Sequence, residues 1–324
     1  MINNEISRSY HMISDNRFYD YILDNDWNMK PVDRSLDKGK IKEYLSRFTD
    51  ENDKKFIKEL LSNTLYVNFK EFKTALIKSF NMFKEKIGME EFYILTPSTK
   101  IGSEDWLIAL LWKELKNLNM KGILTINSDI PLKKNTNILI IDDAIYSGVN
   151  TVSTIDNFTY DLANAENKTV SQIGEYFTFH LVIPFYTENG MEKNIKPFCK
   201  LYNINIEFYG IYEVPTLLKL IDIHKYYGDD VDSVLSNKFG IQLVDMPPIY
   251  FDHKVAGYMS TYSSIYLLGK IPNSSSDFGH LFKVRPSREK IEELSDLYEK
   301  NRYSYIIEQN EKIMRQLMEQ LSRK

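Results

Sequence analysis

The sequence of 324 residues has almost no cysteine and no long apolar run. Its single cysteine, Cys199, excludes an intramolecular disulfide, which suits a reducing compartment. No run approaches the ~20 apolar residues of a membrane span. The first residues also lack the charged and apolar regions of a signal peptide. We therefore expect a cytoplasmic protein without a membrane segment.

The sequence also lacks a large excess of charge and the common glycine-rich phosphate loops. The formal net charge of −4 gives no reason to expect nucleic-acid binding through bulk electrostatics. Neither G-x-x-x-x-G-K-[ST] nor G-x-G-x-x-G occurs, which argues against a P-loop and a standard dinucleotide-binding fold. Apolar residues make up 43% of the chain, enough for the core of one large domain or two modest ones.

The most informative stretch covers residues 138–151. It opens with four apolar residues, as does a strand that is buried on both faces of a parallel sheet. Asp142 and Asp143 follow at once, and a short loop with Ser147 and Gly148 leads into a segment that can start a helix. This order places two carboxylates and backbone N–H groups at the carboxyl end of a strand, where open α/β sheets bind ligands. Such N–H groups bind phosphate, and carboxylates bind sugar hydroxyls or a hard cation such as magnesium.

The stretch resembles the phosphoribosyl-pyrophosphate signature of the type I phosphoribosyltransferases. That signature is a hydrophobic strand, two acids, a few variable residues, a hydroxyl residue, glycine, any residue and a hydroxyl residue. Asp142 and Asp143 match the acid pair, and Ser147 and Gly148 match the hydroxyl–glycine step. The match covers about fourteen residues and is moderately specific.

The phosphate half of the signature is altered. Asn150 stands where the last hydroxyl is expected, and Thr151 lies one position later. Tyr146 stands where a small or hydroxyl residue is common.

The resemblance implies a fold, two ligands and a reaction. It implies a parallel-sheet α/β core that binds phosphoribosyl pyrophosphate with Mg2+, and a nitrogen nucleophile that displaces pyrophosphate from the anomeric carbon of the sugar. Asp142 and Asp143 would hold the ribose hydroxyls or the magnesium shell, as catalytic and metal-binding residues. The loop after them would contact the substrate and hold its 5′-phosphate, through Ala144, Tyr146, Ser147, Gly148, Val149, Asn150 and Thr151.

Three other interpretations fit the same residues. The first is a buried strand that ends in a solvated Asp-Asp turn, because Asp also caps helices and stabilises turns. The second is a response-regulator receiver, but the later strand at 177–184 ends without the phosphoacceptor Asp that this fold needs. The third is a nucleotide-binding loop of another type, which the missing glycine motifs disfavour.

Two further segments are candidates for the same site. In type I phosphoribosyltransferases a pyrophosphate-binding loop follows the first core strand, and Ser98, Thr99 and Lys100 lie at the equivalent place. Lys100 is either a point-charge contact to phosphate or an ordinary exposed loop lysine.

The second segment follows the apolar run at 249–251. Asp252, His253 and Lys254 come directly after it. If that run joins the sheet in parallel, these residues lie near the acid pair and His253 can exchange a proton with the nucleophile. Otherwise they form a charged strand end that faces water.

The pattern of apolar residues divides the chain into three parts. We expect an N-terminal helical region at 1–87, a phosphoribosyltransferase-like α/β core at 88–270 and a C-terminal loop and helical tail at 271–324. Within them it predicts helices at 50–63, 69–87, 151–163, 189–202 and 214–239, the last with a break at 228–230, and a further helix that Ser103 caps. It also predicts strands at 92–95, 122–126, 138–141, 176–185 and 204–212, and a loop at 164–175.

In a second hypothesis the protein has the same fold but does not catalyse the transfer reaction. The chain would then be a regulatory or effector module that binds a nucleotide or a partner protein. Altered phosphate loops of this type also occur in divergent phosphoribosyltransferase-like proteins of bacterial antiviral conflict systems and of large viruses. The flanking helices suit docking onto a protein partner. Tyr146 and Asn150 favour this hypothesis, and the intact acid pair favours a transferase.

Overall fold

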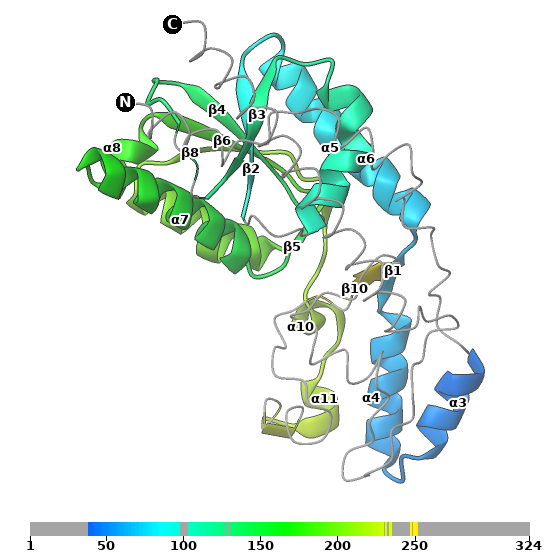
Figure 1. The fold of residues 1–324 in the computed structure, drawn as a ribbon. Coiled ribbons are helices and arrows are strands. Elements are labelled where there is room, and N and C mark those ends of the chain that lie inside the picture. Colours follow the sequence, from blue (N-terminus) through cyan, green and yellow to red (C-terminus); the bar gives the residue numbers. More distant parts are fainter. Residues whose placement is uncertain are drawn as a thin grey trace, which may run out of the picture.

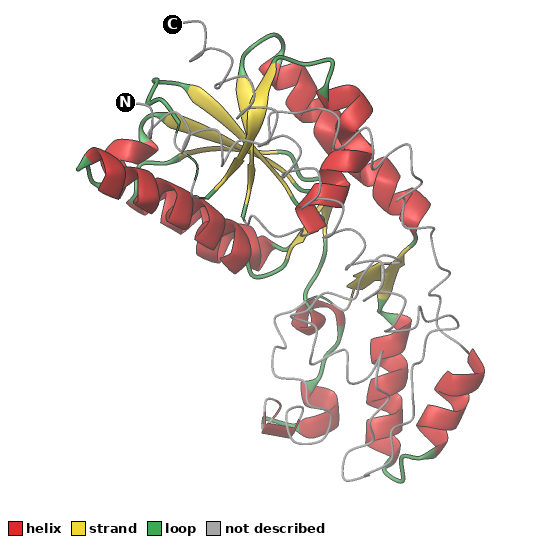
Figure 2. Ribbon diagram, in the orientation of Figure 1, coloured by secondary structure: helices red, strands yellow, loops and turns green. Residues whose placement is uncertain are grey.

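The computed structural model describes residues 38–97, 103–126, 128, 130–229, 231, 233–234, 247 and 249–251. Its centre is a sheet of five parallel strands with helices on both faces (Figures 1 and 2). Across the sheet, the strands follow the order β3 (Met120–Thr125), β2 (Phe92–Thr96), β4 (Thr136–Ile141), β6 (Phe177–Val182) and β8 (Asn205–Phe208). The predicted α/β class with a parallel sheet is confirmed.

Strand β4 is a continuous apolar run because both of its faces are buried. Successive side chains of a strand point to opposite faces of the sheet. Leu139 and Ile141 belong to the core on one face, which α5 (Phe69–Ile87) and α6 (Ser103–Leu115) cover. Ile138 and Ile140 belong to the core on the other face. That face is covered by α7 (Val149–Glu166), α8 (Val170–Gly174), the π-helix η1 (Gly190–Ile195) and α9 (Lys196–Leu201).

Helix α5 begins and ends at the predicted residues and buries one apolar face. The Asn68 side chain accepts a hydrogen bond from the Glu71 N–H, and the Glu71 side chain accepts one from the Asn68 N–H. This capping box stabilises the first turn. Gly88 follows the last helical residue as the C-cap. Apolar residues that recur at steps of three and four are buried on one face of the helix: Phe72, Leu76, Phe80, Phe83 and Ile87.

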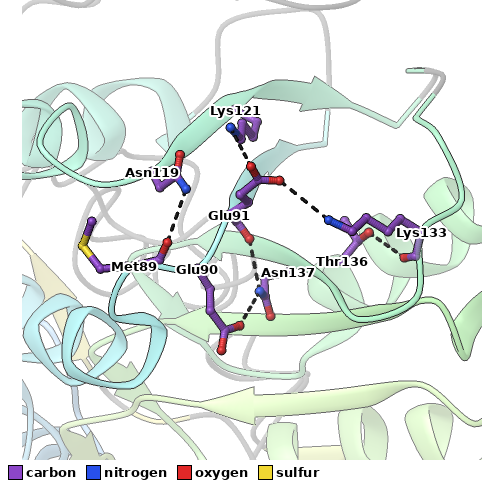
Figure 3. Close-up of polar contacts among 8 residues, drawn as sticks. All are labelled: Met89, Glu90, Glu91, Asn119, Lys121, Lys133, Thr136 and Asn137. Atoms are coloured by element: carbon purple, nitrogen blue, oxygen red, sulfur yellow. Dashed lines mark hydrogen bonds and ion pairs between the residues drawn. The ribbon is translucent and has the colours of Figure 1, made fainter.

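Polar contacts hold the amino edge of the sheet in register (Figure 3). The Asn137 amide donates to the Glu90 carboxylate at 3.0 Å and to the Glu91 carbonyl at 3.1 Å. The Glu91 carboxylate lies 2.7 Å from the Lys121 ammonium and 3.9 Å from that of Lys133. These contacts tie together the starts of β2, β3 and β4, at the edge opposite to the acid pair.

Three strands break at the carboxyl edge and then continue. The continuations are β5 (Ala144–Ile145), β7 (Phe185–Tyr186) and β9 (Tyr212–Glu213), which form a second, small parallel sheet. Strand β4 breaks at Asp142 and Asp143. The acid pair therefore lies at a break between two strands, followed by a two-residue strand that the sequence did not predict.

The remaining described elements lie below the sheet in the view of Figure 1. They are α3 (Lys38–Ser46), α4 (Glu51–Ser62), β1 (Leu65–Val67), α10 (Leu217–Leu220), α11 (His224–Tyr227) and β10 (Ile249–Phe251). The apolar run at 249–251 forms the strand β10. However, it pairs in parallel with β1 and does not join the five-stranded sheet. This pairing removes the premise that placed the following residues at the carboxyl edge of the main sheet.

Two other predicted elements are corrected. The loop expected at 164–175 contains α8, which begins with a capping box between Thr169 and Gln172. In place of the helix expected from 214 to the break at 228, the structure has the two short helices α10 and α11, and α11 does end at the expected break, with Gly228 as its C-cap. Within the described ranges, no helix combines the length and the apolar character needed to cross a membrane.

Candidate functional site

A cavity of about 260 Å³ opens at the carboxyl ends of β2, β3 and β4. From β2 the chain proceeds to β3 at one edge of the sheet, and from β4 it proceeds to β6 and β8 on the other side. The order of the strands thus reverses between β2 and β4, and such a reversal creates the crevice in which open α/β sheets bind ligands. The cavity is lined by Pro97, Glu104, Ile126, Ile140, Ile141, Asp142, Asn150, Thr151, Ser153, Thr154 and Asn157.

Asp142 is the first residue after β4, and it lines this cavity. Its N–H donates to the Val182 carbonyl at 3.3 Å, so the backbone is still tied to β6 at this point. One carboxylate oxygen accepts a hydrogen bond from the Asp143 N–H at 2.8 Å. The side chain is half-buried, which suits a carboxylate that contacts both the protein and a ligand.

Asp143 is placed differently. It is 1% exposed and does not line the cavity. Burial and then the charges of Asp143 and Asp142 raise the pKa of Tyr146 well above its ordinary value. The acid pair is therefore divided between a cavity-lining Asp142 and an interior Asp143.

Tyr146 is itself an interior residue. Its side chain is buried among apolar residues, and its hydroxyl has no hydrogen-bond partner in the part of the chain that the structure describes. The bulky residue that departs from the phosphoribosyl-pyrophosphate signature thus fills the core, and it does not line the cavity.

The loop after the acid pair delivers the first turn of α7 to the cavity. Gly148 is the N-cap of α7, with φ 76° and ψ −3°. The Ser147 hydroxyl accepts a hydrogen bond from the Val149 N–H at 3.4 Å. Asn150 and Thr151 line the cavity. The other predicted contacts of this stretch do not line the cavity: Ala144 is buried in β5, the Val149 side chain is 47% exposed, and Ser147 and Gly148 lie in the loop that precedes α7.

Four polar residues of the cavity were not predicted from the sequence. Ser153, Thr154 and Asn157 follow Asn150 at helical spacing and extend its face along α7. The first turn of α6 contributes Glu104. The spacing of i, i+3, i+4 and i+7 from Asn150 was a usable signal, because those positions share one face of a helix. Glu104 carried no comparable signal beyond its place near a helix start.

The charge of the cavity wall is negative. Glu104 and Asp142 are acidic, and no basic residue occurs among the described residues that line the cavity. Two carboxylates suit Mg2+, which proteins hold through one or two carboxylates together with the phosphates of a substrate. Across the described ranges, no group of three or more His, Cys, Asp and Glu side chains gathers to hold a metal alone.

Six predicted contact residues lie outside the described residues. Ser98, Thr99 and Lys100 come directly after Pro97, which lines the cavity. Asp252, His253 and Lys254 come directly after Phe251. The assignments of these six residues stay predictions.

Comparison with known proteins found no family model and no curated protein sequence that matches the chain.

Proposed function

We propose that this cavity binds phosphoribosyl pyrophosphate, or a closely related sugar phosphate, together with Mg2+. We further propose that the chain transfers the phosphoribosyl group to a nitrogen nucleophile. The observation that supports this most is that Asp142 and the first turn of α7 line one cavity at the reversal of strand order. The resemblance of residues 138–151 to the phosphoribosyl-pyrophosphate signature supplies the identity of the ligand.

Two sets of residues in the cavity wall suit the two kinds of group on such a ligand. The carboxylates of Asp142 and Glu104 suit a metal ion or the ribose hydroxyls. The start of α7 suits a phosphate, because the N–H groups of a first turn and the helix dipole favour negative charge. A carboxylate close to the ribose also stabilises the positive charge that develops on the sugar when pyrophosphate leaves.

A regulatory module without turnover is the second candidate. Asn150 lines the cavity where the signature has a hydroxyl, and Asp143 lies in the interior. Both features favour a site that binds the sugar pyrophosphate but no longer transfers the phosphoribosyl group. Release of pyrophosphate in a screen of nucleobases with Mg2+ supports the transferase, and tight binding of the sugar pyrophosphate without any release supports the module.

The binding proposal predicts a specific effect of Asp142→Asn. Titration calorimetry with phosphoribosyl pyrophosphate should show magnesium-dependent binding to the wild type. In Asp142→Asn that binding should weaken roughly 10–100-fold, since a charge-assisted contact contributes about 1.5–3 kcal/mol. The melting temperature should stay nearly unchanged, because the side chain is half-buried at the cavity.

Asp161→Asn is the matched control. Asp161 is an exposed acid of α7 and does not line the cavity, so its neutralisation should leave binding unchanged. Equal losses in the two variants would assign the effect to overall charge. A large loss of stability in Asp142→Asn with binding preserved would show that Asp142 is structural.

A further inference from the structure

We propose that Thr187 and Asn194 are positioning residues of the loop at 146–148, which leads into α7 and whose N–H groups would bind a phosphate. They bind two successive backbone carbonyls of that loop and so orient the N–H groups on its other side. This inference rests on the proposed phosphate site at the start of α7, and it adds two residues that the signature does not contain.

Thr187 connects the loop to the start of η1. It follows β7 directly and is 1% exposed. Its hydroxyl donates to the Tyr146 carbonyl and accepts a hydrogen bond from the Gly190 N–H at 3.0 Å. Its own N–H donates to the Ile145 carbonyl at 2.9 Å. One buried side chain thus satisfies a loop carbonyl and an N–H at the start of the π-helix.

Asn194 binds the next carbonyl of the loop from the same helix. Its side-chain amide donates to the Ser147 carbonyl at 2.7 Å. The π-helix lies very close to the loop here, since a Cβ added to Gly148 would be 2.6 Å from the Gly190 carbonyl oxygen. π-helical turns are rare and occur often at functional sites.

The geometry of the peptide unit determines how these two contacts orient the N–H groups of the loop. In a trans peptide the C=O and the following N–H point in opposite directions, and the described chain has no cis bond. With the Tyr146 and Ser147 carbonyls bound to Thr187 and Asn194, the Ser147 and Gly148 N–H groups point away from those side chains. Neither N–H has an acceptor among the described residues. Successive N–H groups with a common direction bind anions.

Removal of the Thr187 hydroxyl should disturb this arrangement. The buried Tyr146 carbonyl and the Gly190 N–H would both lose their partner, and the loop would gain alternative orientations. A phosphate would then have to order the loop as it binds. The affinity for a phosphate ligand should therefore fall even though Thr187 does not line the cavity.

The test compares Thr187→Val, Thr187→Ser and Asn194→Ala with the wild type. Asn194 is exposed, so Asn194→Ala also gives a result if Thr187→Val does not fold. Thr159→Val is the control, because Thr159 is likewise a buried threonine whose hydroxyl donates to a carbonyl, at 2.8 Å from Ile155 O, but within α7. Two measurements are made: amide hydrogen exchange of residues 146–151 without ligand, and the dissociation constants of phosphoribosyl pyrophosphate and ribose 5-phosphate with Mg2+.

We expect faster exchange in the loop of Thr187→Val and Asn194→Ala, wild-type exchange in Thr187→Ser, and no loop effect in Thr159→Val. Both sugar phosphates should bind about tenfold more weakly to the first two variants, as about 1.4 kcal/mol of ordering free energy requires. Unchanged loop exchange in both variants would overturn the inference, as would faster loop exchange with unchanged affinity. If the wild type binds neither sugar phosphate, the proposed function is wrong, and the exchange data still decide whether Thr187 and Asn194 position the loop.

Discussion

Gly148→Ala is expected to lower the free energy of unfolding by about 3 kcal/mol. Two costs add at this position. An alanine at φ 76° is strained by about 1–2 kcal/mol in the left-handed region. Its Cβ would also be 2.6 Å from the Gly190 carbonyl oxygen and 3.0 Å from the Ile195 side chain, and such overpacking costs about 1–3 kcal/mol. Because the clash involves backbone, the loop and η1 must separate.

Asn167→Ala separates these two costs. Asn167 is the C-cap of the same helix and is also left-handed, with φ 52° and ψ 45°. An alanine there introduces the backbone strain without the contact to η1, so a loss of about 1 kcal/mol is expected. The free energies of unfolding of both variants are measured by denaturant titration. Equal losses at the two positions would show that close packing between the loop and η1 contributes nothing.

Acidification from pH 7 to pH 4 is expected to destabilise the protein through His180 by on the order of 3 kcal/mol. His180 is 2% exposed on β6. Its Nδ1 is 2.9 Å from the Tyr209 hydroxyl and its Nε2 is 3.0 Å from the Asn137 side-chain oxygen. Burial disfavours the charged ring and lowers the pKa of His180 from 6.5 to about 4.

The sign of the effect follows from where the proton binds. Between pH 6.5 and 4 the unfolded chain holds a proton on His180 that the folded protein does not hold, so stability falls as the pH falls. The contribution is complete above pH 6.5 and is lost as the pH falls to about 4. Unfolding free energies of the wild type and of His180→Gln, measured across this range, give the difference. A wild-type pH dependence no steeper than that of His180→Gln would contradict the account.

The elements that the sequence predicted best are those with strong local signals. Strand β4 is a continuous apolar run, and α5 combines a capping box, a periodic apolar face and a C-cap glycine. In contrast, β10 is three residues long and pairs with β1 from the other end of the described chain. Nothing local distinguishes that pairing from addition to the main sheet.

The sequence predicts only part of the candidate site, because a motif does not show which of its side chains face the cavity. The motif groups the two acids as a unit, yet adjacent residues of an extended chain point to opposite sides. Asp142 and Asp143 accordingly have different surroundings, one at the cavity and one in the interior. The motif predicts a substrate contact for Tyr146, although a large aromatic residue is as well suited to fill a core.

The position of a bound metal ion tests the central claim most directly. Crystals grown with phosphoribosyl pyrophosphate and Mn2+ in place of Mg2+ would reveal the metal by its anomalous scattering. The account predicts a single strong anomalous peak in the cavity, next to the Asp142 carboxylate and a phosphate of the ligand, with another phosphate at the start of α7. Ligand density at a different place, with the cavity beside Asp142 empty of both metal and sugar phosphate, would contradict it.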